Sequence, residues 1–210
     1  MNSPVMQRIN ELKLVPVIVL EDAASAAPLA EALISGGLPC AEVTFRSAAA
    51  VQSIRNMARF ADICLGAGTV LNVDQVKAAV DAGARYIVTP GFNSEVVGYC
   101  VEHDIPVIPG ISTPTEIEFG LKFGLEVLKF FPAESFGGLQ TLKAISAPYA
   151  MIKFIPTGGI NAANVRDYLA FNKVHACGGS WMVRKDLIDA GKFDEIASLT
   201  RSAVDLVAEL

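Results

Sequence analysis

Residues 63–89 read ICLGAGTVLNVDQVKAAVDAGARYIVT, and this stretch holds one complete copy of the pattern that decides the fold. Ile63–Gly66 and Tyr86–Thr89 are short apolar runs typical of buried strands, and Val73–Ala82 between them is amphipathic and rich in alanine. Gly83 follows the helical run directly, where helices commonly end. A strand, a helix and a second strand in this order predict parallel strands joined by a crossover.

The same unit recurs on both sides of this stretch, with no linker or low-complexity segment between copies. Strands are expected at Val15–Leu20, Ala41–Thr44, Ile63–Gly66, Tyr86–Thr89, Pro106–Pro109, Val127–Phe131, Met151–Pro156 and Val174–Gly178. Helices are expected at Ala23–Ser35, Ala48–Phe60, Val73–Ala82, Ser94–His103, Thr115–Phe123, Leu139–Ala147, Asn164–Ala170 and Phe193–Leu206. Eight such units in 210 residues predict an α/β fold, a single-domain (β/α)8 TIM barrel over residues 1–210. An open doubly wound sheet is the alternative, but no G-x-G-x-x-G follows the first strand.

Composition narrows the class of protein and of partner. Hydrophobic residues make up 52% of the chain, which suits strands buried on both faces. A net charge of -5 argues against nucleic acid as a partner but allows a small anionic ligand. No apolar run reaches the roughly 18 residues of a membrane span, and no signal peptide is recognisable. The four cysteines are scattered without a C-x-x-C pair, so we expect reduced thiols and a cytoplasmic protein.

The second strand ends in two charged residues. Barrel enzymes carry their chemistry where strands end, at the carboxyl face. Here the sequence reads Glu42-Val43-Thr44-Phe45-Arg46, and a period of two puts Glu42, Thr44 and Arg46 on one face. An isolated buried charge is costly. The pattern therefore predicts either a structural ion pair between Glu42 and Arg46 or a ligand site, and these residues alone favour neither.

The sixth strand, Val127–Pro132, contains a lysine in an otherwise apolar run. Burial disfavours the ammonium form of a lysine and leaves a nucleophilic amine, so Lys129 is a candidate catalytic residue. The competing interpretation is a lysine whose stem is buried while its charge reaches solvent outside the barrel. Lys153 in the seventh strand also stands three residues before a proline, and spacing does not choose between the two lysines.

Glycine pairs follow the seventh and eighth strands, in Thr157-Gly158-Gly159 and Gly178-Gly179-Ser180. Barrels commonly bind phosphate at these two loops through backbone amides, so both pairs predict a phosphate site. Gly66-Ala67-Gly68-Thr69 after the third strand and Pro90 after the fourth are weaker candidates for ligand contacts. Neither histidine, His103 or His175, ends a strand, so both are interpreted as structural and no metal site is predicted.

Taken together, the strand ends resemble those of the 2-keto-3-deoxy-6-phosphogluconate (KDPG) aldolase family, also described as 4-hydroxy-2-oxoglutarate aldolases. The matching segments are residues 42–46, 66–71, 90–91, 108–113, 128–134, 156–160 and 178–181, in family order over essentially the whole chain. The related phosphogalactonate aldolases are similar in outline but differ after the fourth, sixth and eighth strands. One departure is Phe45, which stands where the family often has leucine, on the face expected to point away from the site.

The resemblance implies a metal-free class I aldolase without a cofactor, a homotrimer of the Entner–Doudoroff pathway that takes a phosphorylated 2-keto acid and releases pyruvate. It assigns the Schiff-base lysine to Lys129 and the general acid/base to Glu42. It assigns substrate carboxylate binding to Arg46. The remaining family positions are Thr69, Pro90 and Phe131 around the keto acid, with Thr157, Gly158, Gly159 and Ser180 at the phosphate end.

Two other functions fit part of the pattern. A phosphosugar isomerase or synthase without a Schiff base would use the two glycine loops but would not require Lys129. A non-catalytic phosphoryl-binding module would also use the loops, but it leaves an inward Glu42, Arg46 and Lys129 without a purpose.

Overall fold

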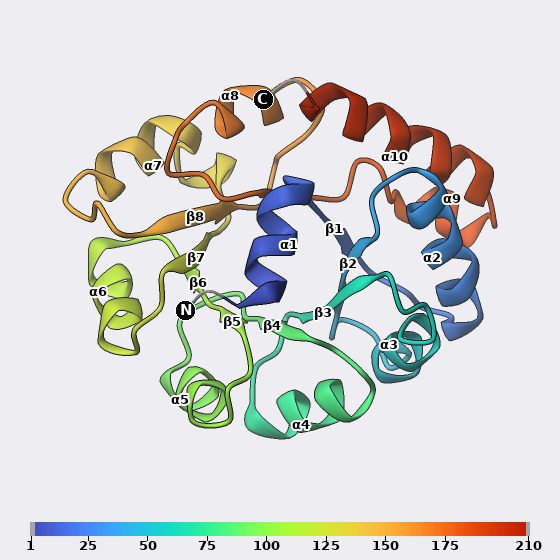
Figure 1. The fold of residues 1–210 in the computed structure, drawn as a ribbon, viewed down its shortest axis with the longest axis horizontal. Helices are drawn as coiled ribbons and strands as arrows, with labels where there is room; N and C mark the ends of the chain where they lie inside the picture. The colour runs from blue at the N-terminus through green and yellow to red at the C-terminus, as the bar shows by residue number, and fades with distance from the viewer. Residues whose placement is uncertain (1–2, 209–210) are drawn as a thin grey trace.

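The computed structural model describes residues 3–208. Its strands are β1 (Leu14–Ile18), β2 (Cys40–Thr44), β3 (Cys64–Gly68), β4 (Tyr86–Val88), β5 (Val107–Ile108), β6 (Gly110–Ile111), β7 (Val127–Phe130), β8 (Lys153–Pro156) and β9 (Cys177–Gly179). Its α-helices are α1 (Pro4–Leu12), α2 (Ala26–Ser35), α3 (Ala50–Met57), α4 (Val73–Asp81), α5 (Ser94–Glu102), α6 (Pro114–Lys122), α7 (Gly138–Ser146), α8 (Val165–Leu169), α9 (Lys185–Asp189) and α10 (Phe193–Val207). Short 3-10 helices η1 (Ala23–Ser25) and η2 (Glu134–Phe136) precede α2 and α7. The strands lie inside, and the helices other than α1 lie around them (Figure 1).

The strands form a curled parallel sheet in two parts. Six strands follow the order β5-β4-β3-β2-β1-β9, and three follow the order β6-β7-β8. The pairs of neighbouring strands within these two parts are parallel, as the strand–helix repeat predicts. β8 and β9 are the end strands of the two parts. Single bridges between Phe154 and Val174 and between Thr157 and Gly178 link the regions of these two strands.

The expected fifth strand, Pro106–Pro109, contains β5, and β6 follows Pro109 as a further short strand that was not predicted. β5 pairs with β4 and β6 pairs with β7, so this segment stands between the two parts of the sheet. Pro109 lies at the break because proline has no N–H to donate to a neighbouring strand. Its carbonyl still accepts a hydrogen bond from the Lys129 N–H at 2.9 Å. The segment therefore changes its pairing partner at Pro109, from β4 before the proline to β7 after it.

Each expected helix is present with bounds shifted by a few residues, but α1 and α9 were not predicted. α1 begins as helix chemistry favours: the Ser3 hydroxyl accepts from Val5 N–H, and Pro4 occupies the first turn. It precedes β1 directly and lies across the middle of the curled sheet, at the amino ends of the strands (Figure 1). There the carbonyl of Met6 contacts His175 Nε2 at 2.9 Å.

The strands are buried on both faces. Every residue of β2 and β3 is buried, and the apolar side chains of strands and inner helix faces form one continuous core. This explains the high hydrophobic content of the chain. All four cysteines are free and buried within it. Among residues 3–208, no helix combines the length and apolar character needed to cross a membrane.

Candidate active site

Lys129 and Glu42 meet inside the sheet. Lys129 lies in β7 and Glu42 in β2, 87 positions apart in the chain, and Lys129 Nζ donates a hydrogen bond to Glu42 Oε1 at 3.2 Å. The two residues are only 6% and 3% exposed. Each charge is thus removed from water and held by the other, which is the arrangement a buried ionic pair requires.

The structure separates the two candidate lysines. Lys153 begins β8 opposite Val127, whereas Lys129 is opposite Ile155 further along the same strands. Lys153 is exposed and donates to the carbonyl of Asn172. Lys129 is buried, so the interpretation in which its charge reaches solvent outside the sheet is wrong for this residue.

Lys129 and Glu42 line a small inner cavity. Its walls are Val15, Glu42, Tyr86, Val88, Ile108, Lys129, Ile155 and Thr157. Tyr86 was not predicted; the signal was available in the period of two that places it on the same face as Val88. Burial raises the pKa of its phenol well above the usual value, so it stays neutral, and its hydroxyl donates to the Ala41 carbonyl at 3.2 Å.

Gly68 provides the space for the glutamate. A Cβ built on Gly68 would lie 2.2 Å from Glu42 Oε1, and one on Gly66 would lie 2.2 Å from the Tyr86 ring. From the sequence, these glycines are weak candidates for contacts with a ligand. Both lie within β3, where the missing side chains leave space for the Glu42 carboxylate and the Tyr86 ring. A side chain at either position would occupy that space.

Arg46 forms no ion pair with Glu42. β2 ends at Thr44, so the strand alternation that predicted an inward Arg46 stops two residues too early. Arg46 is exposed in the following turn, and Glu42 pairs with Lys129 instead of with it. The Thr44 hydroxyl donates to the Ile18 carbonyl at 2.8 Å. Of the two alternatives that the sequence left open, the structural ion pair between Glu42 and Arg46 is therefore wrong.

Arg46 lines an outer pocket together with residues of the two glycine loops. This pocket is lined by Val17, Val19, Arg46, Gly159, Ile160, Asn161, Ser180, Trp181, Val183, Arg184, Lys185 and Asp186, and its volume is ≈ 600 Å³. A volume of this size is typical of small-molecule sites. The loop after β8 lines both cavities, because Thr157 lines the inner one and Gly159 the outer one.

The loop after β8 is shaped for close approach to an anion. Gly158 and Gly159 have φ of 96° and 83°, a region that favours glycine. Among residues 3–208, neither the Gly159 N–H nor the Ser180 hydroxyl has a hydrogen-bond partner. Two side-chain amides, those of Asn161 and Asn164, each donate to the Gly159 carbonyl at 3.1 Å and hold its peptide group in place.

The segment after Lys129 braces this loop. The N–H groups of Ala133 and Glu134 donate to the carbonyls of Thr157 and Gly158 at 2.8 and 3.0 Å. The Glu134 carboxylate accepts a hydrogen bond from the buried Tyr168 hydroxyl. The strand that carries the lysine and the loop that faces the outer pocket are therefore positioned as one unit.

The other expected site residues lie near these cavities or at strand ends. Lys129 Nζ is 5.2 Å from the centre of the Phe131 ring, and Phe131 and Pro132 are joined by a cis peptide bond. Thr69 follows β3 with φ of 54°, an unusual conformation for a β-branched residue and one that clusters at functional sites. Pro90 follows β4, with its carbonyl against Gly110. Thr69 and Pro90 line neither cavity, so their contact with a ligand stays a prediction.

The histidines lie away from the cavities, as expected. His103 follows α5 and stacks on Tyr99 with ring centres 4.0 Å apart. His175 precedes β9 rather than lying within it as predicted, and burial lowers its pKa.

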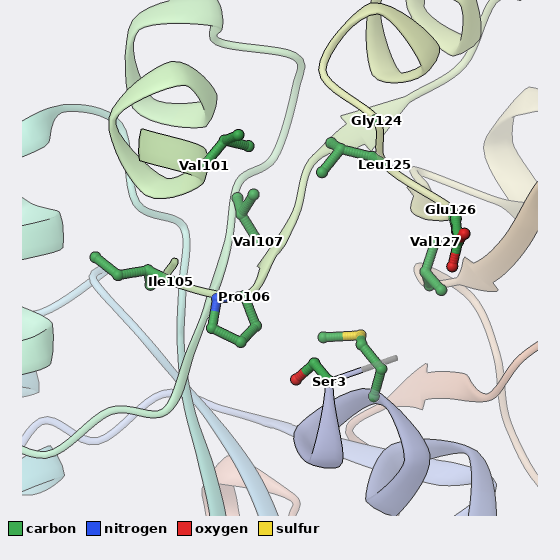
Figure 2. Close-up of a pocket in the computed structure, with 10 residues that line it drawn as sticks. Ser3, Val101, Ile105, Pro106, Val107, Gly124, Leu125, Glu126 and Val127 are labelled. Atoms are coloured by element: carbon green, nitrogen blue, oxygen red, sulfur yellow. The ribbon is translucent and has the colours of Figure 1, made fainter. Parts of the chain in front are cut away.

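A further apolar pocket lies at the opposite end of the strands. Pro106 and Val107 at the start of β5, Val127 at the start of β7, and Ser3 ahead of α1 face one another there (Figure 2). None of the expected site residues lines it. In parallel barrels this amino-terminal face is associated with stability rather than chemistry.

Known proteins share this fold and sequence. The family model for KDPG and KHG aldolase matches residues 5–199. A 2-dehydro-3-deoxy-phosphogluconate aldolase of Treponema pallidum is 46% identical over 204 residues, covering 97% of each chain.

Solved structures agree with this match. A KDPG aldolase of Legionella pneumophila with pyruvate captured at low pH as a covalent carbinolamine intermediate superposes with a TM-score of 0.92. It is 37% identical, and the match covers 96% of this chain and 98% of that one. A Zymomonas mobilis aldolase with 3-phosphoglycerate gives a TM-score of 0.90 and 35% identity, over 97% and 96% of the two chains.

The protein is therefore an aldolase of class I, a carbon–carbon lyase. More specifically, the chain belongs to the KDPG and KHG aldolase family.

Because Gly68 provides room for the Glu42 carboxylate, Gly68→Ala is expected to displace it from Lys129. General acid–base catalysis typically contributes about 100-fold or more, so aldol cleavage should fall by at least about that factor. The measurement is steady-state pyruvate release, with circular dichroism as the check on folding. Gly98→Ala on α5 is the control, since its Cβ would meet Phe123 at an ordinary 3.5 Å. A Gly68→Ala enzyme with full activity would contradict this role.

Proposed function

We propose that this protein cleaves 2-keto-3-deoxy-6-phosphogluconate to pyruvate and glyceraldehyde 3-phosphate, and also 4-hydroxy-2-oxoglutarate to pyruvate and glyoxylate. The single observation that carries the proposal is the buried pair of Lys129 Nζ and Glu42 Oε1 at 3.2 Å. It places a primary amine and a carboxylate side by side at the wall of a cavity. The names of the relatives and of the superposed structures support the choice of substrate.

Lys129 is the proposed nucleophile. It passes a proton to Glu42 and its nitrogen attacks the C2 ketone, giving a carbinolamine. Glu42 returns that proton to the carbinolamine hydroxyl, which leaves as water, so that an iminium ion forms and Glu42 is again a carboxylate. As the C3–C4 bond breaks, its electron pair moves toward the iminium nitrogen and forms an enamine, while the C4 hydroxyl loses its proton and becomes the aldehyde.

Glu42 is the proposed general base and acid. Its carboxylate takes the C4 hydroxyl proton, directly or through a water, and returns a proton to C3 of the enamine. Water then hydrolyses the iminium and releases pyruvate and the free lysine. Gly68 keeps the carboxylate beside Lys129 throughout, because it leaves the volume of a Cβ empty.

The remaining residues are proposed to bind and orient the substrate. Arg46 holds the carboxylate; among residues 3–208 its guanidinium has no partner, so it is open to an anion. Residues assigned to the keto-acid moiety are Thr69, Pro90 and Phe131. Residues assigned to the phosphate end are Thr157, Gly158, Gly159 and Ser180. Binding energy at the phosphate can then help to orient the reacting centre.

The assembly and cellular setting are part of the same proposal. We propose a complete single-domain (β/α)8 barrel over residues 1–210, since two parallel sheet parts and two bridges already arrange the strands in barrel order. The four buried free cysteines are consistent with the cytoplasm, which cell fractionation would check.

We also propose a homotrimer. Phe119 is 41% exposed, and its ring centre lies 5.8 Å from that of Phe92, which follows β4. Leu71, which follows the neighbouring strand β3, is 53% exposed. Exposed apolar groups of this kind commonly mark contacts between subunits. Light scattering after size exclusion should give the mass of three chains. A mass of one chain at micromolar concentration would contradict the proposal.

Trapping tests the nucleophile. Borohydride reduction in the presence of pyruvate should label Lys129 covalently, because it reduces the iminium to a stable amine. Peptide mapping by mass spectrometry locates the adduct. Lys129→Met should abolish both labelling and turnover, whereas Lys153→Met, the matched control, should retain both. An adduct on Lys153 would overturn the assignment, and turnover without any adduct would favour a reaction that needs no Schiff base.

A substrate panel tests the phosphate end. Phosphate-free 4-hydroxy-2-oxoglutarate should show a kcat/KM at least about tenfold below that of the gluconate-derived substrate, since it forgoes the charge-assisted hydrogen bonds to the loop. Pyruvate release coupled to a dehydrogenase gives both values. The galactonate-derived epimer belongs in the same panel and should react more slowly. Equal kcat/KM with and without phosphate would remove the proposed role of Gly159 and Ser180.

A further inference from the structure

Positive charge gathers at the outer pocket. Arg46, Arg184 and Lys185 line it, and Asp186 is the carboxylate among its lining residues. The whole chain has the opposite balance, with 22 acidic and 17 basic residues. The excess of cations at this pocket is therefore a local feature. It stands beside the Ser180 hydroxyl, which has no hydrogen-bond partner among residues 3–208.

Arg184 is held at the pocket by two kinds of contact. The N–H of Val183 donates to the Ser180 carbonyl at 3.1 Å, which closes the turn between Ser180 and Arg184. The Arg184 carbonyl in turn accepts from Leu187 N–H at 3.1 Å. The guanidinium donates to both oxygens of Asp186, from Nε at 3.1 Å and from Nη2 at 2.6 Å. The backbone is thus fixed next to Ser180, while only an ion pair holds the side chain.

That ion pair can be exchanged for a ligand. The Arg184 and Asp186 side chains are 55% and 60% exposed, and exposed ion pairs contribute little to stability. The planar guanidinium presents its N–H groups in a fork that fits two phosphate oxygens as well as two carboxylate oxygens. A phosphate dianion that enters the pocket therefore offers Arg184 the same geometry with more charge.

We propose that Arg184 is a specificity-determining residue: it leaves Asp186 and binds the substrate phosphate, and so sets the preference for phosphorylated substrates. The inference rests on the function proposed above and adds a side chain to a phosphate site otherwise built from loop residues. Asp186 keeps the guanidinium at the pocket while no phosphate is bound. Lys185 has a different environment, since its ammonium pairs with Asp189 one turn along α9 at 2.6 Å.

Arg184→Ala tests the inference through a difference between two substrates. The expected result is a kcat/KM about tenfold lower for the phosphorylated sugar acid, mostly through KM, and a change of less than about twofold for 4-hydroxy-2-oxoglutarate. Arg55→Ala is the matched control: Arg55 is an exposed arginine on α3 that donates to Gln52, and its loss changes the net charge equally. Equal losses on both substrates, or no loss on either, would overturn the inference.

Asp186→Asn separates a binding role from a structural one. If Arg184 binds phosphate, removing the competing carboxylate should leave KM for the phosphorylated substrate unchanged or lower. If the ion pair only holds the loop, Asp186→Asn should raise KM as much as Arg184→Ala does, and the inference fails.

Inorganic phosphate gives a readout that does not depend on turnover. Titration calorimetry should show about tenfold weaker phosphate binding by Arg184→Ala than by the wild type and Arg55→Ala proteins. Should the wild type cleave neither substrate, the proposed function fails, yet this titration still decides the role of Arg184. Phosphate binding by Arg184→Ala equal to that of the wild type would overturn it.

Discussion

The contact between Lys129 and Glu42 is the interaction on which the rest of the structure depends. Two opposite charges are buried in the centre of a hydrophobic protein, 3.2 Å apart. Such a pair adds little net stability, yet removal of one partner leaves a buried charge uncompensated at a cost of about 3–5 kcal/mol. The fold must therefore hold both side chains in register. Nearly everything around the inner cavity can be understood as meeting that requirement.

Empty space is part of this arrangement. In β3 the glycines leave room for the Tyr86 ring and for the Glu42 carboxylate. Gly178 does the same for Thr157, since a Cβ there would lie 2.4 Å from the Thr157 hydroxyl. Close packing elsewhere in the core makes these small volumes decisive, because neighbouring side chains cannot shift to create them. Position of the functional groups is thus controlled as much by missing side chains as by contacts.

In the proposed function, the inner cavity holds the reacting groups and the outer pocket binds the far end of the substrate. The inner cavity is mostly apolar and carries the amine and carboxylate, whereas the outer pocket is exposed and rich in hydrogen-bond donors and cations. They are coupled mechanically, because backbone hydrogen bonds tie the segment after β7 to the loop after β8. A substrate with a reactive ketone at one end and an anion at the other matches this division.

Sequence by itself determined the order of strands and helices, their parallel arrangement and the candidate residues at strand ends. These follow from local signals: apolar runs, helical periodicity and glycines after helices. Spacing alone could not choose between Lys129 and Lys153, because both stand in apolar strands with the same spacing to a proline, and only the resemblance to a known family favoured Lys129. Tertiary structure separated them by position along β7 and β8, since only Lys129 reaches Glu42 across the sheet. The tertiary structure also ends β2 at Thr44, before Arg46. It brings Arg184 and Ser180 together in the lining of one pocket. Packing between segments far apart in the chain decides where a strand ends and which side chain fills the space beside a glycine. Local sequence patterns do not contain that information.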